Sequence, residues 1–387
     1  MKRVEGISKL SGQEQFVDDL PAEGALWGAT VRSPAPRGRI REVRFGPGID
    51  WSQFVIVDHR DIPARNTILL IEEDQPVLAS DYTRHLHEPV VLLAHPSRDA
   101  LREAIGSIEI IVEPEPPVLD FRVPPTPDQI QFGPDNVLKH LRTEKGDVEG
   151  AMAGAPVVVE GVYETGAQEH LYLETQGMLA WEENGVITVT GSMQCPYYVL
   201  GALCSALGRD PEQVRVIQSA TGGGFGGKEE FPSGLAIHAA LLALKGGNPV
   251  KLVYDRMEDM ATTTKRHPSL VRHRTGLDRE GRLLAQEVEV ILDGGAYVTL
   301  FPVVLSRALI HAGGPYHCEN VRIVGRAVLT NSPPFGAFRG FGAPQTQFAA
   351  ERHMDRIAAE LGMDPVELRR RNLIREGQST ATGQVIR

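Results

Sequence analysis

The feature that most constrains this chain is a glycine-rich stretch, ATGGGFGGKEE, at residues 220–230. Five glycines in six positions give a backbone that bends tightly and lets another group approach closely. Two nucleotide-binding patterns fit the stretch. Gly222, Gly224 and Gly227 match G-x-G-x-x-G, and residues 222–228 match G-x-x-x-x-G-K. The stretch therefore predicts a loop that can meet a ligand through its backbone.

Both nucleotide interpretations conflict with the neighbouring residues. A phosphate-binding loop needs Ser or Thr after its Lys, but Glu229 and Glu230 follow Lys228 and would repel phosphate. A dinucleotide loop leaves a strand directly and has an acidic residue about 20 positions later. Here three residues separate the strand-like VRVIQ from the loop, and Asp255 comes too late. A nucleotide-binding protein and a ligand-free glycine turn stay as alternatives.

Composition narrows the classes of protein further. The 387 residues suggest two or three domains, and a net charge of −10 disfavours a nucleic-acid partner. No run of 18 apolar residues occurs, which argues against a membrane span, and MKRVEGISKLSGQEQF has no apolar core for a signal peptide. Cys195, Cys204 and Cys318 are too few for an iron–sulfur cluster or a disulfide framework. We therefore expect a cytoplasmic protein, with any iron–sulfur clusters on another subunit.

Proline density divides the chain into two blocks. Residues 1–120 alternate strand-like apolar runs with turn residues and include a helical pattern at 97–108, which predicts an α+β domain. Dense prolines at 113–134 predict an inter-domain linker, which we place at 121–150. Residues 151–387 form the second α+β block, with helices expected at 229–247, 346–364 and 365–377. Strands are expected at 25–33, 54–58, 89–94, 108–115, 157–164, 185–191, 214–219, 248–255 and 284–295.

The glycine stretch is one of five motifs that occur in a fixed order. The others are QEHLYLET (168–175), SMQCP (192–196), LSRALIH (305–311) and GAFRGFGAPQTQFAAE (336–351). Together they resemble the molybdenum-binding subunit of the xanthine dehydrogenase family of molybdenum hydroxylases. GISKLSGQEQFVDDL, LWGATVRSPAPRGRI and HEPVVLLA are similar to the family's hammerhead domain. The resemblance covers essentially the whole chain and implies a hammerhead domain (1–120) followed by the first molybdopterin-binding domain (151–387).

The resemblance implies a molybdenum–pyranopterin cofactor, as such or in its cytosine dinucleotide form, with no protein side chain bonded to the metal. Gln194 is similar to the family's glutamine whose amide bonds a ligand of the metal. Phe225 and Gly226 correspond to residues whose backbone lies against the molybdenum centre, and Arg339 to the arginine whose backbone faces it. Cofactor binding is therefore expected at Gln194, Phe225, Gly226 and Arg339.

Three further residues carry the implied substrate site. Glu229 corresponds to the glutamate that contacts purines, and Arg307 to the arginine that stabilises negative charge on the heterocycle during catalysis. Phe341 corresponds to one of two phenylalanines that sandwich the substrate ring. Aldehyde-oxidising members typically replace one of the charged pair. The presence of both favours hydroxylation of a purine or related N-heterocycle with water as oxygen source, and aldehyde oxidation is the alternative.

Partner subunits follow from the same resemblance. In the family the molybdenum subunit continues well beyond the last motif, and its second half carries most cofactor contacts and the glutamate general base. We expect this chain to be half of a naturally split subunit, as in nicotinate-oxidising members, or a truncated one. Its partners would be a second molybdenum-binding half, an iron–sulfur subunit and an FAD subunit. A non-catalytic assembly subunit of the same fold is a further alternative.

Two histidines in RHLHEP are spaced as metal ligands can be, but the segment offers too few further ligands for a metal site. His85 and His87 have only Glu88 beside them, at the head of an expected strand. No H-E-x-x-H pattern occurs in the chain. The segment is expected to be a solvated turn.

Overall fold

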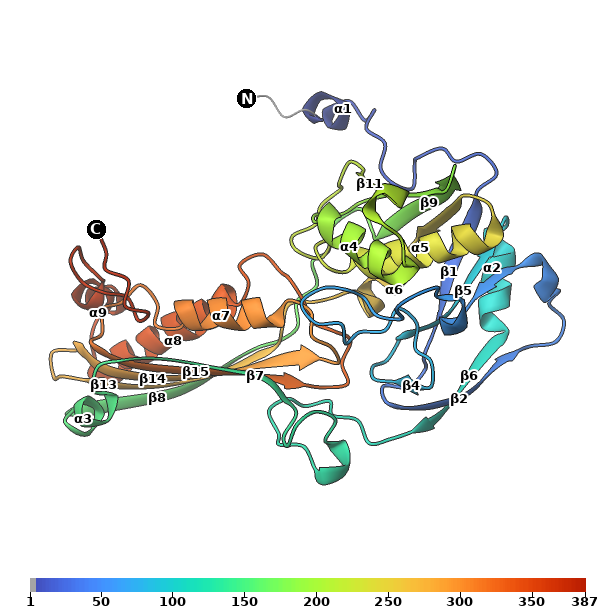
Figure 1. Ribbon diagram of the computed structural model, residues 1–387. Helices are drawn as coiled ribbons and strands as arrows, with labels where there is room; N and C mark the ends of the chain where they lie inside the picture. Colours follow the sequence, from blue (N-terminus) through green and yellow to red (C-terminus); the bar gives the residue numbers. More distant parts are fainter. Residues whose placement is uncertain (1–4) are drawn as a thin grey trace.

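Two large sheets lie end to end in this α+β protein and give it an elongated shape (Figure 1). The computed structural model describes residues 5–387. The expectations for the N-terminal stretch and for the start of the first domain fall partly on residues 1–4, which lie outside the described residues. We call the part around the seven-stranded sheet the first lobe and the part around the five-stranded sheet the second lobe. Within residues 5–387 no helix has the length and apolarity needed to cross a membrane.

The first lobe is a mixed seven-stranded sheet with helices on both faces. Its strands, in sheet order, are β11 (Val214–Gln218), β10 (Val186–Gly191), β9 (Gly177–Glu183), β12 (Val250–Val253), β1 (Leu26–Arg32), β5 (Pro89–His95) and β3 (Val55–Val57). Helices α4 (Pro196–Leu207) and α5 (Pro232–Gly246) form the main core with one face. Helix α2 (Arg98–Gly106) packs on β1 and β5 within a separate core.

Helix α5 follows the glycine stretch and is buried along most of its length because nearly all of its residues are apolar or small. Twelve of its fifteen residues are buried, as a helix without a polar face requires. Pro232 begins the helix, where its missing N–H costs nothing, and Gly247 ends it in the left-handed conformation with φ 65°. The predicted buried helix at 229–247 is therefore confirmed.

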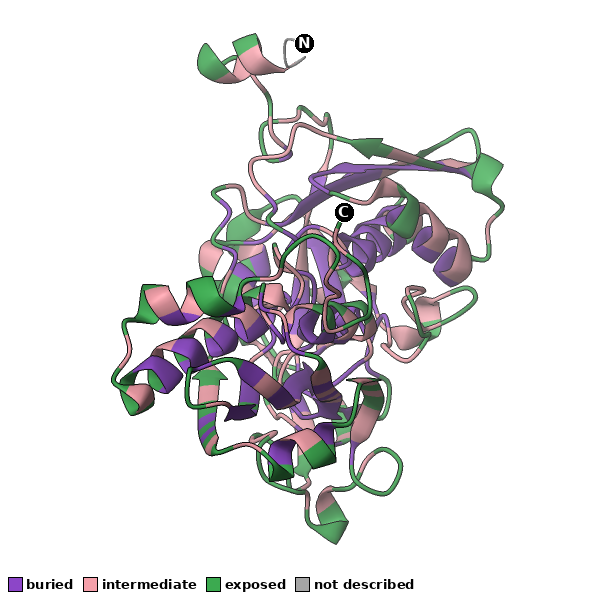
Figure 2. Cartoon of the chain, turned by 90° about the vertical axis from the view of Figure 1, so that its left-hand side faces the viewer, coloured by how far each residue is buried: buried purple, intermediate pink, exposed green. Residues whose placement is uncertain are grey.

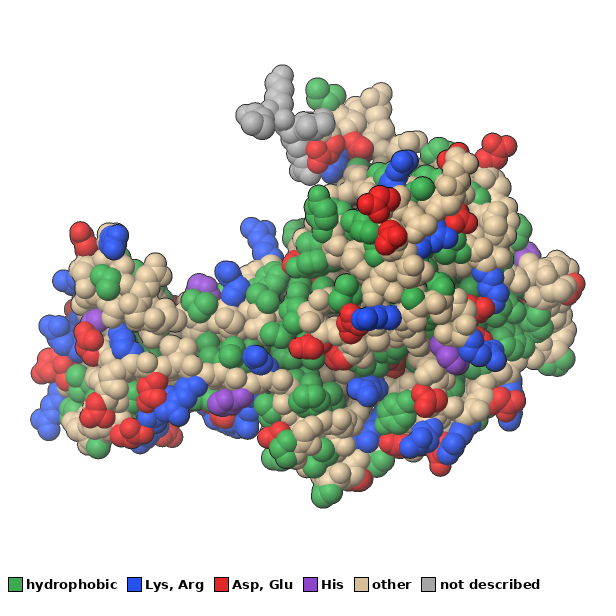
Figure 3. Space-filling model, viewed as in Figure 1, with side chains coloured by type: hydrophobic (Ala, Val, Ile, Leu, Met, Phe, Trp, Pro, Cys, Tyr) green, Lys and Arg blue, Asp and Glu red, His purple; other side chains and the backbone are tan. Residues whose placement is uncertain are grey.

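The second lobe is a five-stranded sheet covered on one face by helices. Its strands, in sheet order, are β7 (Val137–Lys145), β15 (Asn320–Leu329), β14 (Leu283–Gly295), β13 (Ser269–Leu277) and β8 (Val157–Thr165). Its helices are α3 (Val148–Ala153), α7 (Phe301–His311), α8 (Ala343–Leu361) and α9 (Pro365–Asn372). The uncovered face carries cross-strand ion pairs such as Arg272–Glu289 and Arg274–Glu287. Figure 3 shows the resulting mixture of positive and negative side chains at this end of the molecule.

Strands from both sequence blocks share the first sheet. β1 pairs with β12 in parallel, with Leu26 opposite Val250, so residues before 121 and after 150 form one core. A smaller sheet belongs to the first block alone, with β4 (Tyr82–Thr83), β2 (Gly38–Phe45) and β6 (Ile108–Pro114). The range 121–150 is not linker throughout, because β7 and the start of α3 lie in it. The alternating sequence VLKHLRTEK lets β7 pair with β15.

The chain crosses between the lobes three times, first through residues 115–136 before β7, and then along two segments that lie side by side. It leaves the second lobe after β8 through residues 166–176 and returns before β13 through 254–268. Gln168 and Arg266 form an isolated bridge between these crossings. The remaining turns are α1 (Gly6–Leu10), α6 (Arg256–Thr262) and short 3-10 turns at 51–53, 59–61, 127–129 and 211–213. Figure 2 shows buried residues along the sheets and helix faces between the lobes, and exposed residues at the periphery.

Two local expectations are wrong for reasons of tertiary contact. Helix α9 ends at Asn372 rather than 377, because the Asn372 amide bonds Gly281 O and Leu368 O and the next residue extends. The RHLHEP turn is partly buried rather than solvated. His85 is 3% exposed, and the buried Glu88 carboxylate accepts hydrogen bonds from Thr83, from the Arg84 N–H and from Tyr297. Glu88 thereby ties the first block to the start of the segment that follows β14.

Candidate functional site

The glycine stretch forms an irregular loop between β11 and α5, at the edge strand of the first sheet. Its turns require left-handed conformations: Gly223 has φ 102°, Phe225 has φ 53° and Gly226 has φ 105°. The φ values above 100° at positions 223 and 226 are open without strain only to glycine. The Phe225 side chain is 49% exposed, which is unusual for an aromatic ring. The loop therefore presents an apolar ring and its own backbone at the surface.

Gln194 holds the middle of the loop. It lies between the end of β10 and Pro196, which begins α4. Its side-chain Oε1 accepts the Gly226 N–H at 2.9 Å, and its own N–H donates to Lys228 O at 2.6 Å. A Cβ at Gly224 would lie 2.4 Å from Oε1, so this approach depends on glycine. Gln194 is exposed, and its side-chain N–H groups have no hydrogen-bond partner among residues 5–387.

The segment that follows β15 closes over the other side of the loop. The Arg339 N–H donates to Phe225 O at 2.8 Å. A Cβ at Gly226 would lie 2.6 Å from Ala337 O, so only glycine permits the two backbones to pass. His170 reaches the same region, with its Nε2 2.8 Å from Ala337 O, and burial lowers its pKa to about 4. Neutral His170 therefore donates this hydrogen bond from Nε2.

The structure thus brings Gln194, Phe225, Gly226 and Arg339 together through direct hydrogen bonds. These are the four residues for which the sequence predicts cofactor binding. Two come from a loop of the first lobe, one from the turn before α4, and one from the segment after β15. Backbone groups make most of the contacts, so the shape of this site depends on glycine positions rather than on long side chains.

The three residues expected at the substrate are less closely joined. Phe341 has φ 45° in a tight turn, and the adjacent Gly342 packs on α7, where an added Cβ would lie 2.3 Å from Val304 O. Arg307 is exposed on the same helix, one turn further along. Glu229 is half-buried between the glycine loop and α5 in the chain, and no hydrogen bond or ion pair joins it to Arg307 within residues 5–387.

Two of the residues expected at the substrate, Glu229 and Arg307, are charged side chains without a partner. The Glu229 carboxylate and the Arg307 guanidinium each have no ion pair or hydrogen bond to another described residue. Burial raises the pKa of Glu229. Charged side chains in a folded protein are normally solvated or paired, and a partly buried unpaired carboxylate loses hydration without a compensating contact. Such groups are suited to bind a polar molecule that is not part of the chain.

Glu230 is not among the predicted site residues, although it directly follows Glu229. Its side chain is 5% exposed, and Oε1 accepts the Ala337 N–H at 2.9 Å. Burial, with a smaller effect from Glu229, raises its pKa to about 8. An added Cβ at Gly336 would overlap Oε1, so Gly336 makes room for it. The only signal in the sequence is the doubled Glu at the end of the glycine stretch.

The phosphate-binding-loop alternative conflicts with the position of Lys228. Its side chain is fully buried, and Nζ lies 2.9 Å from a Glu174 carboxylate oxygen. A phosphate-binding loop needs this amine at the surface, where it can reach a phosphate. Lys228 instead forms a buried ion pair with Glu174.

The open side of the loop fits a polar group rich in oxygen and nitrogen atoms. A hollow of about 440 Å³ is lined by Lys9, Phe16, Gln194 and residues 221–225. It offers backbone groups, a free side-chain amide and two apolar rings. Among residues 5–387, no group of three or more His, Cys, Asp or Glu side chains could hold a metal ion.

Comparison with known proteins places both parts of the chain. Residues 11–116 match the a/b hammerhead domain of aldehyde oxidase and xanthine dehydrogenase, and residues 130–373 match the molybdopterin cofactor-binding domain. The chain is 35% identical to the nicotinate dehydrogenase large molybdopterin subunit of Eubacterium barkeri, over 99% of this chain and 91% of that one. It is 33% identical to xanthine dehydrogenase 1 of Arabidopsis thaliana, over 96% of this chain and 27% of that one.

Solved structures agree. The aldehyde oxidoreductase of Desulfovibrio gigas superposes with a TM-score of 0.90 and 28% identity, over 99% of this chain and 44% of that one. The chain therefore spans nearly all of one relative and less than half of the other two. The predicted resemblance and the predicted α+β fold, a hammerhead domain with a molybdopterin-binding domain, are confirmed.

Proposed function

Because the chain belongs to the xanthine dehydrogenase family of molybdenum hydroxylases, we propose that it is half of a split molybdenum-binding subunit. The assembled enzyme hydroxylates a purine or related N-heterocycle. The observation that carries this proposal is the presence of a backbone-lined hollow together with two unpartnered charges, Glu229 and Arg307. A relative that covers this chain almost completely is named for nicotinate, which is an N-heterocycle.

The cofactor is held through backbone and amide groups. The free N–H groups of Gln194 and the backbone of Phe225, Gly226 and Arg339 are the candidate contacts. Gln194 and Phe225 line the open hollow, and hydrogen bonds join Gly226 to Gln194 and Arg339 to Phe225. The bound molybdenum–pyranopterin supplies the redox chemistry that inserts an oxygen atom from water into a C–H bond. Gly224 and Gly226 let the Gln194 side chain and the Ala337 backbone pack directly on the loop.

Glu229 and Arg307 act on the substrate. Arg307 stabilises the negative charge that spreads into a nitrogen heterocycle when its carbon is attacked, so it favours the transition state over the bound substrate. Glu229 orients the ring by accepting hydrogen bonds from its N–H or O–H groups. Phe341, on the turn beside α7, contacts one face of the ring.

A second molybdenum-binding chain covers the loop in the assembled enzyme. Large apolar side chains around the loop are exposed in this chain: Leu173 is 93% exposed, Tyr197 83% and Met257 77%. Figure 3 shows hydrophobic side chains gathered on the viewed face between the lobes. Exposed apolar surface of this kind marks a contact with another polypeptide. Iron–sulfur and FAD subunits complete the proposed enzyme.

Metal analysis tests the proposal. The chain purified alone should contain little molybdenum, because it supplies only one side of the hollow. The complex purified with its partner subunits should contain about one molybdenum atom per copy and should oxidise nicotinate or a purine. Stoichiometric cofactor in the isolated chain would contradict the split-subunit proposal. A complex with molybdenum that oxidises aromatic aldehydes but no heterocycle would favour the aldehyde alternative. The similarity to an aldehyde oxidoreductase is the reason to test this alternative.

A further inference from the structure

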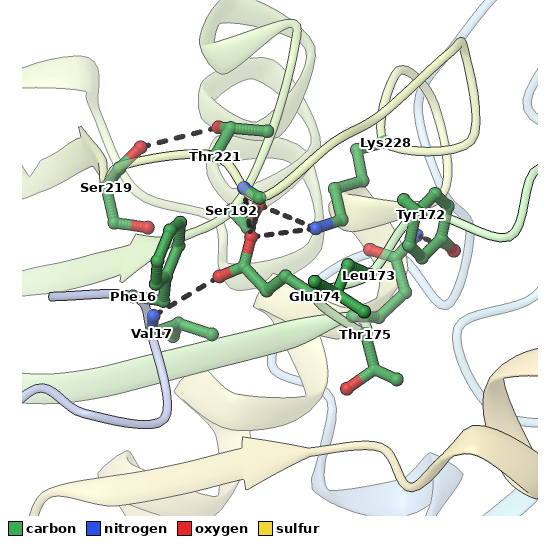
Figure 4. A network of polar contacts seen from close by, with 12 residues as sticks. Phe16, Val17, Tyr172, Leu173, Glu174, Thr175, Ser192, Ser219, Thr221 and Lys228 are labelled. Atoms are coloured by element: carbon green, nitrogen blue, oxygen red, sulfur yellow. Dashed lines mark hydrogen bonds and ion pairs between the residues drawn. The ribbon is translucent and has the colours of Figure 1, made fainter. Parts of the chain in front are cut away.

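One carboxylate behind the glycine loop joins four segments of the chain (Figure 4). Glu174 Oε2 accepts hydrogen bonds from the Gly222 N–H at 2.7 Å, from Ser192 Oγ at 2.7 Å and from Lys228 Nζ at 2.9 Å. Its Oε1 accepts the Val17 N–H at 3.3 Å. Four donors on one carboxylate saturate most of its acceptor positions.

The donors on Glu174 lie at both ends of the glycine loop and beside Gln194, the residues proposed to bind the cofactor. Gly222 is the first glycine of the loop, and Lys228 directly follows the last one. Ser192 lies two residues before Gln194, whose Oε1 holds the middle of the loop. Glu174 therefore fixes both ends of the loop and the segment that supports its centre.

The approach is close and depends on a buried charge. A Cβ at Gly222 would lie 2.5 Å from Glu174 Cβ, so this glycine is needed for the contact itself. Lys228 is fully buried, with Nζ also donating to Ser192 Oγ at 2.9 Å and lying 4.7 Å from the centre of the Tyr172 ring. Burial lowers the pKa of Lys228, and the Glu174 carboxylate opposes that effect.

We propose that Glu174 and Lys228 are positioning residues, whose ion pair sets the glycine loop and Gln194 in the one arrangement that receives the cofactor. The inference rests on the proposed function of the loop. Both side chains are almost completely buried, at 11% and 0% exposed, so they act through the loop and touch neither cofactor nor substrate. The fold does not need an ion pair here, because an apolar pair of similar volume often stabilises a protein as well.

Backbone amide exchange on the purified chain tests the tie without any cofactor. Glu174→Gln and Lys228→Met should each speed exchange in residues 219–230 and 190–195 by about tenfold or more, since hydrogen bonds to a charged group are lost. Glu182→Gln is the matched control. It breaks the partly exposed Arg209–Glu182 ion pair on β9 of the same sheet and should leave these segments unchanged.

The double variant Glu174→Gln/Lys228→Met separates positioning from charge burial. It removes both charges, so its melting temperature should recover toward that of the wild type, while loop exchange stays fast. This variant also carries the test if either single variant fails to fold. Wild-type exchange at 219–230 in the double variant would overturn the proposal.

Molybdenum content of the assembled complex provides the second measurement. Complexes with either single variant or the double variant should retain much less molybdenum than the Glu182→Gln complex. Fast loop exchange together with normal molybdenum content would show that the tie exists but the loop does not receive the cofactor. That result would overturn both the positioning role and the proposed function of the loop, whereas unchanged exchange would overturn the positioning role alone.

Discussion

The two lobes contribute to the candidate site in different ways, although each is a sheet covered by helices. The first lobe supplies a backbone loop that hydrogen bonds fix at its start (Gly222), in its middle (Gly226) and at its end (Lys228). The second lobe supplies Arg307 on α7 and the turn with Phe341, and the Arg307 side chain has no partner within residues 5–387. In the proposed site, the first lobe supplies most of a fixed surface for the cofactor and also Glu229 for the substrate. The second lobe supplies the other free side chains for the substrate, and the segment after β15 adds the Arg339 backbone to the cofactor side.

The lobes also differ in the polar groups they bury. In the core of the first lobe, His238 is buried alone and its Nε2 bonds Val77 O at 2.9 Å. The second lobe stacks two imidazoles, His273 and His353, with ring centres 4.9 Å apart. Neither ring nitrogen of His273 has a hydrogen-bond partner among residues 5–387. The second lobe therefore buries two imidazoles in direct contact, and the stability of the protein should respond to acid through this pair.

The largest expected effect is that of Gly226→Val on the fixed surface. The new Cβ would lie 2.6 Å from Ala337 O at a φ of 105°, so the loop and the segment after β15 must move apart. Activity of the reconstituted complex should be abolished, with its molybdenum content reduced. Gly48→Val is the matched control, because Gly48 has φ 96° and nothing within 4 Å of an added Cβ. Normal turnover by Gly226→Val would show that the loop does not meet the cofactor.

The next effect concerns the free side chains. Arg307→Met should lower turnover of an N-heterocycle by roughly 10²-fold, the usual cost of losing one preorganised charge donor. Oxidation of an aromatic aldehyde, in which less charge spreads into a ring, should fall much less. Steady-state rates on both substrates check this, with Arg352→Met on α8 as a surface control. Equal losses on the two substrates would make Arg307 structural and would remove the contrast between the lobes.

A smaller effect is expected from acid on the second lobe. Burial lowers the pKa of His273 to about 3 and that of His353 to about 4, so both are neutral in the fold at pH 7. The unfolded chain binds protons near pH 6.5, and the free energy of unfolding therefore falls as pH drops below that value. The slope is about 1.4 kcal/mol per pH unit for each group until the folded pKa is reached.

Substitution isolates this contribution. His273→Leu should lose less stability between pH 7 and pH 5 than the wild type, as measured by chemical denaturation at each pH. His140→Leu, on the exposed part of β7, should behave as the wild type. If all three chains lose stability equally, the stacked imidazoles are not the acid-sensitive element.

The smallest effect is expected from base on the first lobe, at a single buried acid. The pKa of Glu230 is raised to about 8 in the fold, above its value of 4.5 in the unfolded chain. Its contribution to stability is therefore fully present below pH 4.5 and is lost as pH rises to about 8. The loss is at most about 1.4 kcal/mol per pH unit.

Glu230→Gln should remove this dependence while retaining an acceptor for the Ala337 N–H. Denaturation between pH 5 and pH 8 should give a flatter profile for this variant than for the wild type, and Glu183→Gln at the exposed end of β9 should match the wild type. A steeper profile in Glu230→Gln would contradict a neutral buried acid at this position.

Many local elements were predictable, because near neighbours in the chain determine them. The expected strands and the helices α2, α5 and α8 are present, and Gly362 ends α8 with φ 61° as its sequence predicts. The strands β2, β4, β7, β9, β13 and β15 and the short helices α1, α3 and α6 were not predicted, and neither were the longer helices α4 and α7. Their apolar residues lack a polar face, which makes short helices hard to distinguish from buried strands by periodicity.

The sequence by itself determined the glycine loop, the order of the motifs and the choice of candidate residues. Only the tertiary structure decided what those residues contact. Glu174 and Lys228 are 54 positions apart and Gly226 and Ala337 are further apart still, and they meet because two crossings between the lobes bring β9, β11 and the segment after β15 together. Patterns of polar residues and glycines in the sequence predict the local conformation of the backbone. Which carboxylate becomes buried against which amine depends on packing across the whole chain, and no window of sequence contains it.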